Sequence, residues 1–219
     1  MENKDRKLVF FDIDGTLICG GSELMSESTK EAIRIARANG HICMINTGRT
    51  KRLVGENLTG QVEFDGLLLG CGTEIEFHGK QLMHKTFSME ESKAILTAMK
   101  KYHVDAVLEG SREDYAPRGE EVFTETFRHM AREIENRKYD RYANAPGNYD
   151  KLYAYAETPA GMDGMKRDLS EILDFIDREQ GFYEIVPKGY SKATAIRYIT
   201  DYLLSLIHIS EPTRLLSIS

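Results

Sequence analysis

The stretch KLVFFDIDGTLICGG, residues 7–21, decides the fold. Residues 7–11 are almost all apolar strand formers, as expected for a strand buried on both faces of a parallel sheet. Asp12 and Asp14 follow at once, and residues two apart on a strand point to the same side. Two carboxylates this close repel each other unless a cation or a shared proton relieves them. The stretch predicts a buried strand whose end carries a pair of acids with a chemical task.

The residues after this stretch alternate between helix and strand patterns. A helix is expected over 26–40, with Ser28 and Glu31 as its capping box and Gly40 at its end. A strand over 41–49, a short helix over 50–58 and a strand over 65–72 follow. This alternation predicts an α/β fold, a Rossmann-like doubly wound parallel sheet, which binds ligands beyond the carboxyl ends of its strands. Asp12, Asp14, Thr47 and Arg49 all fall at such ends.

The middle of the chain predicts an inserted α+β block. A hairpin is expected around His78, and a helix over 88–104 with a capping box from Ser88 to Glu91. Strands over 104–110 and 151–157 and helices over 121–137 and 164–179 complete the block. The chain then returns with a strand, a lysine-bearing loop and a helix over 181–203. The expected division is a core domain of residues 1–80 and 184–203, a cap domain of residues 81–183, and a tail of residues 204–219.

Three motifs, in this order, carry a resemblance to a known family. DIDGTL (12–17), NTGR (46–49) and KGYSKATAI (188–196) resemble motifs one to three of the haloacid dehalogenase-like (HAD) phosphatase superfamily. The insertion between the second and third motifs resembles the cap of the Cof-type branch (class IIB cap). The resemblance extends over residues 7–203 and implies a HAD-like core with an α+β cap.

The resemblance also implies a division of labour among the motif residues. Asp12 would be the nucleophile that forms an aspartyl-phosphate. Asp14 would protonate the leaving oxygen and then activate water. Both would hold Mg²⁺, which screens the repulsion between a phosphate ester and a carboxylate. Lys192 would neutralise charge on the nucleophile and the transferring group. The implied phosphate-binding residues are Gly15, Thr16, Thr47, Gly48 and Lys192.

Each of these interpretations has a plainer alternative. The two aspartates alone fit a helix-entry turn, and Thr47 to Arg49 fit any strand-to-helix turn. Arg49 is expected to be a structural or salt-bridged residue rather than a catalytic one. Lys188 competes with Lys192, although the spacing of the family motif favours Lys192. Four tyrosines are expected to pack in the core, with a substrate pocket as their alternative: Tyr102, Tyr115, Tyr153 and Tyr155. The histidines show no metal-ligand spacing.

The end of the sequence departs from the family pattern. The family carries a fourth motif of the form GDxxND, whose acids complete the metal shell, and after Asp201 the only acid here is Glu211. Residues 204–214, LSLIHISEPTR, read as the translation of a transposase adapter used in short-read sequencing libraries. We therefore expect native sequence to end near Leu203, and the chain as given to bind Mg²⁺ poorly and to turn over slowly. A genuine C-terminal helix is the alternative, against which Pro212 argues.

Composition narrows the class of protein and its partners. The net charge of −6 from 29 Lys+Arg and 35 Asp+Glu argues against nucleic acid as a partner. The residues before Asp12 include no apolar stretch long enough for a signal peptide, and the apolar run at 202–209 is far shorter than the about 20 residues that cross a bilayer. Three dispersed cysteines, Cys19, Cys43 and Cys71, suit a reducing cytoplasm and a role as small buried apolar residues.

The expected function is Mg²⁺-dependent hydrolysis of a small phosphorylated metabolite, such as a sugar phosphate, through an aspartyl-phosphate. A cap of this size closes over the site, which favours small substrates over phosphoproteins. Two alternatives stay open: a non-catalytic protein that binds a phosphorylated ligand, and a phosphosugar mutase of the same superfamily. The substrate and the oligomeric state do not follow from the sequence.

Overall fold

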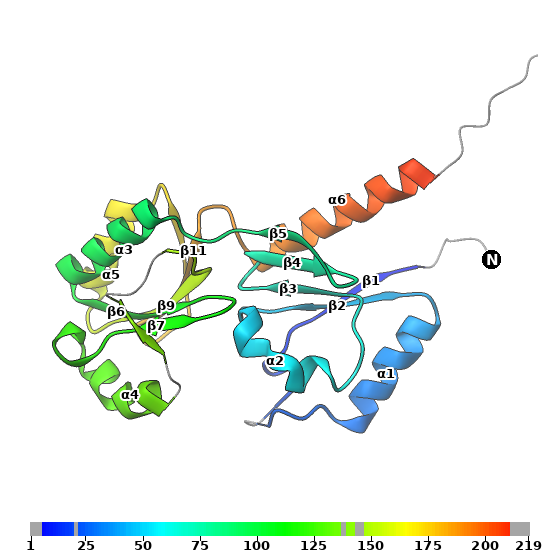
Figure 1. Ribbon diagram of the computed structural model, residues 1–219, viewed down its shortest axis with the longest axis horizontal. Coiled ribbons are helices and arrows are strands. Elements are labelled where there is room, and N and C mark those ends of the chain that lie inside the picture. The colour runs from blue at the N-terminus through cyan, green and yellow to red at the C-terminus, as the bar shows by residue number, and fades with distance from the viewer. Residues whose placement is uncertain (1–5, 20–21, 137–138, 143–146, 211–219) are drawn as a thin grey trace, which may run out of the picture.

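The computed structural model describes residues 6–19, 22–136, 139–142 and 147–210 of the chain. The described residues form two β-sheets that lie side by side, each with its own helices (Figure 1). The first and last described segments both belong to the first sheet and its helices, and the residues of the second sheet come between them. The expected α/β fold, with an α+β block inserted into it, is confirmed.

The first sheet has the strand order β1-β2-β3-β4-β5. Its first three strands are parallel, with Phe11 opposite Ile45 and Ile45 opposite Leu67. The last two strands are antiparallel and form the hairpin expected around His78, whose φ of 47° suits a tight turn. The strands are β1 (Leu8–Phe11), β2 (Ile42–Asn46), β3 (Gly66–Leu69), β4 (Glu74–Phe77) and β5 (Lys80–His84).

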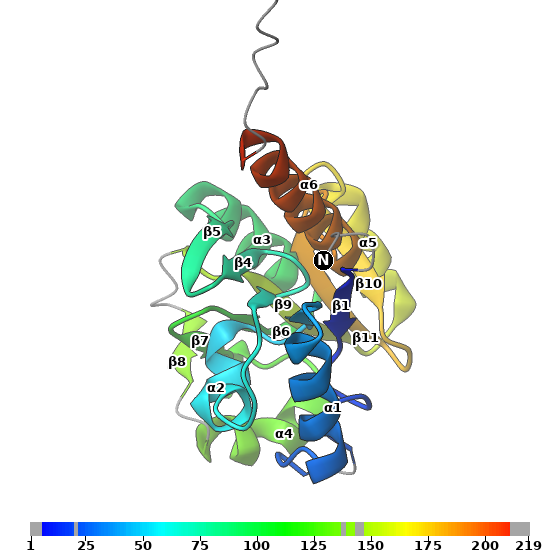
Figure 2. The same cartoon turned by 90° about the vertical axis from the view of Figure 1, so that its right-hand side faces the viewer.

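Helices cover both faces of this sheet. On one face, α1 (Glu27–Ala38) and α2 (Lys51–Thr59) bury Ile33, Val54 and Leu58 against the strands. Figure 2 shows α6 (Lys192–Ser210) on the opposite side of β1 from α1, and its Ala195 and Ile199 are buried in the core of this other face. Alternate residues of β1, β2 and β3 contribute to these two cores, which explains why every residue of β2 is buried.

The start of α1 differs from the expected one. The N-cap is Ser26, whose side chain accepts a hydrogen bond from the amide of Thr29, and the predicted capping box of Ser28 and Glu31 is wrong. The two serines are two positions apart and have equal capping chemistry, so that sequence alone does not distinguish them. The capping box of α3 (Met89–Tyr102), from Ser88 to Glu91, is confirmed.

The second sheet has the order β10-β11-β9-β6-β7-β8 and is antiparallel except between β7 and β8. Helices α3 and α5 (Pro159–Leu169) pack on one face, and α4 (Glu125–Asn136) packs on part of the other. A short 3₁₀ helix spans Gly119–Glu121. The strands are β6 (Val104–Glu109), β7 (Asp114–Ala116), β8 (Asp140–Arg141), β9 (Lys151–Ala156), β10 (Leu173–Asp177) and β11 (Phe182–Pro187).

The helix expected over 164–179 is wrong in its second half. Helix α5 ends at Leu169, and Leu173–Asp177 form the edge strand β10, which pairs with β11 from Leu173 opposite Pro187 to Asp177 opposite Tyr183. The apolar residues of this segment fit a helical period as well as an alternating one. Pairing with a strand later in the chain decides between the two.

The strands next to the expected domain boundaries are β5 and β11. Strand β5 pairs within the first sheet and β11 pairs within the second. The expected boundaries, residues 1–80 and 184–203 for the core and 81–183 for the cap, stay a prediction. Helix α6 continues to Ser210, and residues 211–219 of the expected tail lie outside the described residues. No helix among the described residues is long and apolar enough to cross a membrane.

Candidate active site

The predicted nucleophile and the predicted lysine meet at the carboxyl end of β1. Lys192 Nζ lies 2.6 Å from Asp12 Oδ2, although 180 positions separate the two residues in the chain. The other carboxylate oxygen of Asp12 accepts the amide of Ile13 at 2.8 Å. Gly15 has a φ of 76°, a left-handed conformation that a glycine adopts without strain. The turn that follows β1 therefore presents Asp12 to the first residue of α6.

The second aspartate of the pair faces Arg49. Asp14 Oδ1 accepts from Arg49 Nη2 at 2.6 Å, and Asp14 Oδ2 accepts from Arg49 Nε at 3.0 Å. A fork of two parallel hydrogen bonds fixes the direction of the carboxylate as well as its charge. The expectation that Arg49 is a salt-bridged residue is confirmed.

The second motif connects β2 to α2 and also holds α6. The side-chain amide of Asn46 donates to the backbone carbonyl of Lys192 at 3.2 Å, so the start of α6 is attached to the end of β2. Thr47 is fully buried, and its hydroxyl accepts the amide of Arg49 at 3.1 Å. Thr47 also donates its own amide to the carbonyl of Leu68. These bonds make the loop a rigid support for Gly48 and Arg49.

A cavity of about 410 Å³ opens where these motifs meet. Of the residues predicted from the sequence, Asp12, Asp14, Gly48 and Lys192 line it. Gly15, Thr16 and Thr47 are not among the lining residues, and their proposed phosphate contacts stay predictions. Lys188 is also absent from the lining, and its ammonium pairs with Asp174 at 2.8 Å. The geometry favours Lys192 over Lys188 as the lysine of the site.

The opposite wall of the cavity comes from the second sheet. Along β9, Leu152, Ala154 and Ala156 pack on the helices, so the alternating residues face the other way. Register brings the wall together, because Glu109 pairs with Lys151 and Glu184 pairs with Tyr153 across neighbouring strands. The wall consists of Glu109, Lys151, Tyr153, Arg178 and Glu184.

The sequence analysis did not single out the charged members of this wall, although it gave Tyr153 a pocket role as an alternative. One signal was present. Lys151 and Glu184 stand inside otherwise apolar strand patterns, and both are buried in the structure, at 3% and 5% exposure. A buried charge within a strand needs a partner, and so points to a cluster.

Burial and neighbouring charges shift the pKa values of the charged wall residues in opposite directions. Burial raises the pKa of Glu109, and Lys151 offsets only part of the effect. Burial also works against the charge of Glu184, but Lys151 and Arg178 outweigh it and lower the pKa of that carboxyl. Glu109 and Glu184 raise the pKa of Lys151 in spite of its burial. Within the wall, Glu184 is therefore the firmest anion.

The residues at the end of β1 fit the Mg²⁺ that the family motifs imply. Asp12 and Asp14 supply carboxylate oxygens from one turn, and their side chains are 41% and 60% exposed. Mg²⁺ prefers oxygen ligands and is often held by one or two carboxylates while it keeps several waters. Asp12 and Asp14 are the residues that would hold the ion.

A second group of possible metal ligands lies elsewhere in the described structure. Glu74, His84 and Asp150 have ligand atoms within 4.8 Å of one another. The hydroxyl oxygen of Ser111 lies 2.6 Å from a carboxylate oxygen of Glu74 and 2.7 Å from one of Asp150, and His84 Nε2 lies 3.0 Å from Asp150. Two of these residues belong to the first sheet, and the other two lie beside strands of the second. Hydrogen bonds within the group account for the arrangement, and it joins the two sheets.

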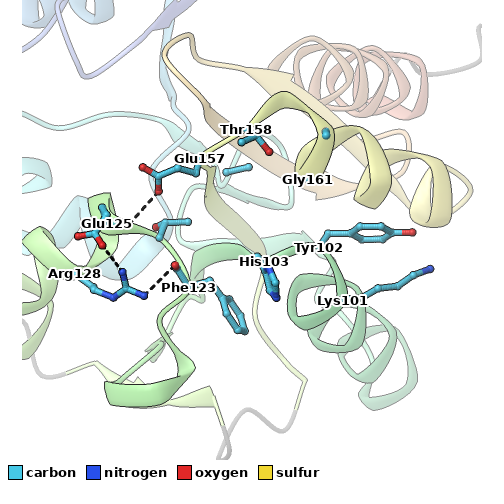
Figure 3. Close-up of a pocket in the computed structure, with 12 residues that line it drawn as sticks. Lys101, Tyr102, His103, Phe123, Glu125, Arg128, Glu157, Thr158 and Gly161 are labelled. Carbon is cyan, nitrogen blue, oxygen red and sulfur yellow. Dashed lines mark hydrogen bonds and ion pairs between the residues drawn. The ribbon is translucent and has the colours of Figure 1, made fainter.

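A larger pocket, of about 570 Å³, lies within the second sheet's layer, between α3, α4 and α5 (Figure 3). Its Arg128 pairs with Glu125, and Glu157 accepts the amide of Glu125. None of the motif residues lines it. Of these two cavities, only the smaller one at the end of β1 is lined by motif residues.

Comparison with known proteins finds similar folds and a matching family. No curated protein matches the chain. A phosphatase of the haloalkanoate enzyme superfamily from Bacteroides thetaiotaomicron has a similar structure, with a TM-score of 0.76, 19% identity, and coverage of 93% of this chain and 76% of that one. A HAD/Cof-like hydrolase from Plasmodium vivax has a TM-score of 0.72 and 19% identity, with coverage of 91% and 75%.

A subclass IIB sugar phosphatase has a TM-score of 0.67 and 20% identity, with coverage of 90% of this chain and 76% of that one. These likenesses show a common fold. The sequence model of the haloacid dehalogenase-like hydrolase family matches residues 9–206, nearly the whole chain. The resemblance drawn from the three motifs is thereby confirmed, and the chain belongs to the haloacid dehalogenase-like hydrolases.

Proposed function

We propose that this protein is a Mg²⁺-dependent phosphomonoester hydrolase whose nucleophile is Asp12. The observation that carries the proposal is the contact of 2.6 Å between Lys192 Nζ and Asp12 Oδ2 at the mouth of a cavity that Asp14 also lines. A carboxylate attacks a phosphate ester only if positive charge offsets the repulsion between the two anions. Lys192 supplies one such charge from the first residue of α6.

The reaction proceeds in two displacements. A carboxylate oxygen of Asp12 bonds to phosphorus while the bond from phosphorus to the leaving oxygen breaks, and Asp14 gives that oxygen a proton. Asp14 then takes a proton from water, whose oxygen attacks phosphorus and releases inorganic phosphate and free Asp12. When Mg²⁺ is bound, it screens the charges that build up on the phosphoryl oxygens.

The dimensions of the site favour a small substrate. The cavity of about 410 Å³ lies between the two sheets, and a metabolite such as a sugar phosphate is of suitable size. The lining offers no basic stripe for nucleic acid, because its cations are paired with acids. Three free cysteines among the described residues are consistent with a reducing cytoplasm.

The test is release of inorganic phosphate from a panel of sugar phosphates and a generic aryl phosphate, with Mg²⁺ and with a chelator. We expect slow, Mg²⁺-dependent release that Asp12→Asn abolishes. A matched control, Asp114→Asn, changes a buried and ion-paired aspartate that does not line the cavity. Binding of the esters without release would instead favour the non-catalytic binding protein. Isomerisation of a sugar phosphate without release would identify a mutase.

A further inference from the structure

Glu184 connects the two sides of the cavity. Its Oε1 accepts from Lys151 Nζ, and its Oε2 accepts from Arg178 Nε at 2.8 Å and also from Arg178 Nη2. Lys151 Nζ lies 3.0 Å from Glu109 Oε2 as well. The side chain of Lys151 is 4% exposed, whereas that of Arg178 is 42% exposed and reaches the open part of the cavity. One buried carboxylate therefore fixes both cations of the wall.

The same carboxylate packs against the second motif. A methyl group added to Gly48 would lie 2.6 Å from Glu184 Oε1, closer than side-chain atoms approach each other. Glu184 belongs to β11 of the second sheet, and Gly48 follows β2 of the first. The position of Lys151 and Arg178 is thus set relative to the phosphoryl site, and not only within their own sheet.

The charges that line the cavity are balanced. The described lining residues comprise four cationic and four anionic side chains, which are Arg49, Lys151, Arg178 and Lys192 against Asp12, Asp14, Glu109 and Glu184. Opposite charges are also paired within each side of the cavity. Lys192 pairs with Asp12 and Arg49 with Asp14, whereas in the wall Lys151 and Arg178 pair with the two glutamates. The wall offers donors and acceptors but no formal net charge, and Tyr153 belongs to it as well.

We propose that Glu184 is a positioning residue that holds Lys151 and Arg178 over the phosphoryl site, where these two cations bind hydroxyl groups of an electrically neutral leaving group. The inference rests on the proposed function and narrows its substrate class. Hydroxyl groups accept from Lys151 and Arg178 and donate to the carboxylates of the wall. A second phosphate or carboxylate on the leaving group would lie near Glu109 and Glu184, and both cations of the wall are already paired with these acids. The anionic group would lose its hydration and gain little attraction in return, so it should bind weakly.

The experiment measures binding in the full chain carrying Asp12→Asn, so that turnover does not interfere. The probes are glucose 6-phosphate, with a neutral leaving group, and glucose 1,6-bisphosphate, with an anionic one. We expect the background protein to bind the monophosphate more tightly. Adding Glu184→Gln removes one negative charge from the wall and frees the two cations, and we expect the ratio of the two Kd values to shift toward the bisphosphate by about tenfold, or about 1.4 kcal/mol.

The control separates positioning from general damage. Asp114→Asn makes the same chemical change at a buried aspartate that pairs with Arg52 between the two sheets, outside the cavity. It should leave the ratio unchanged. If Glu184→Gln lowers the affinity for both probes equally, or leaves the ratio of the two Kd values unchanged, the proposal is overturned, because a merely structural role lowers both affinities together.

A second variant keeps the proposal testable if Glu184→Gln does not fold. Arg178→Met removes the more exposed cation of the wall. We expect this variant to bind glucose 6-phosphate more weakly and to retain its affinity for inorganic phosphate. Equal weakening of both ligands would contradict the assigned role. If the background protein binds no phosphate ester and no inorganic phosphate, and the unmodified chain releases none, the proposed function itself fails, and this inference fails with it.

Discussion

Arg49 holds both carboxylate oxygens of Asp14, with Nη2 2.6 Å from Oδ1 and Nε 3.0 Å from Oδ2. Asp14 is the group proposed to exchange a proton with the leaving oxygen and then with water. A general acid must point at the atom it protonates, and the arginine fork fixes the direction of this carboxylate. Arg49 is therefore a positioning residue for Asp14, and the interaction can be tested by substitution.

We predict that Arg49→Met lowers kcat by about tenfold, whereas Asp14→Asn lowers it by about 10²- to 10⁴-fold, the range for loss of a general acid or base. Release of phosphate at saturating substrate measures both. A free energy of unfolding close to that of the unmodified chain is expected for Arg49→Met, because Asp14 is 60% exposed and exposed ion pairs add little. A rise in kcat in Arg49→Met would mean that the pair restrains Asp14 rather than orients it.

We predict that Gly48→Ala destabilises the protein by about 1–3 kcal/mol, as overpacking of a filled site does. The added methyl group would lie 2.6 Å from Glu184 Oε1 and 3.4 Å from the sulfur of Cys71. Urea unfolding measures the change. In the double variant Gly48→Ala with Glu184→Ala, the loss of unfolding free energy should be smaller than the sum of the two single losses. The shortened side chain at position 184 leaves room for the added methyl group. Full additivity of the two changes would show that they do not meet.

We predict a pH-dependent stability that depends on His84. Its hydrogen bond to Asp150 raises the pKa of His84 above the ordinary value near 6.5, against the effect of burial, and Glu74 adds to the rise. The folded state then binds the proton more tightly than the unfolded state. The stabilisation is fully present below the unfolded pKa and is lost as the pH rises through the folded one.

Urea unfolding at about pH 6 and about pH 8.5 tests this prediction, because the two values bracket the ordinary histidine pKa near 6.5. The loss of unfolding free energy between the two conditions should be smaller in His84→Asn than in the unmodified chain. His129→Asn, which changes an exposed histidine of α4, serves as the control. A larger loss at high pH in His84→Asn would contradict the assigned contact.

We predict that the cysteines differ sharply in reactivity. Burial raises the pKa of Cys71 to about 12, with a further contribution from Glu184, and burial also raises the pKa of Cys43. The thiolate is the reactive form, so neither should be alkylated in the folded protein near neutral pH. Cys19 is exposed, contrary to the expectation that all three cysteines are buried. Mass spectrometry after iodoacetamide should find one adduct in the folded chain and none in Cys19→Ser.

The sequence predicted the part of the site that is written in contiguous motifs. A strand followed by DIDGTL places two acids at a sheet edge, and the order of the motifs brings Lys192 to Asp12. Such short patterns contain both the residues and the turns that orient them. The contact of Arg49 with Asp14 was not predicted, because the sequence gives the charges at a strand end but not how they pair.

The rest depended on pairing between distant strands. Lys151 and Glu184 meet only because β9 and β11 are neighbours in a particular register, which neither segment determines alone. The same holds for β10, whose residues read as helix until β11 is beside them. Local patterns determine where elements begin and end within a few residues, and the register between paired strands determines which charges share a cavity.

The short connection from β11 to α6 passes from one sheet to the other beside Lys192. Its first residues are bound to the second sheet, because the amide of Lys188 donates to the carbonyl of Ile172 and the amide of Gly189 donates to Asp174. Lys192, which follows the connection, is tied to the first sheet through Asn46. The lysine that contacts Asp12 therefore stands where the chain crosses between the sheets, so its position depends on how both sheets are placed.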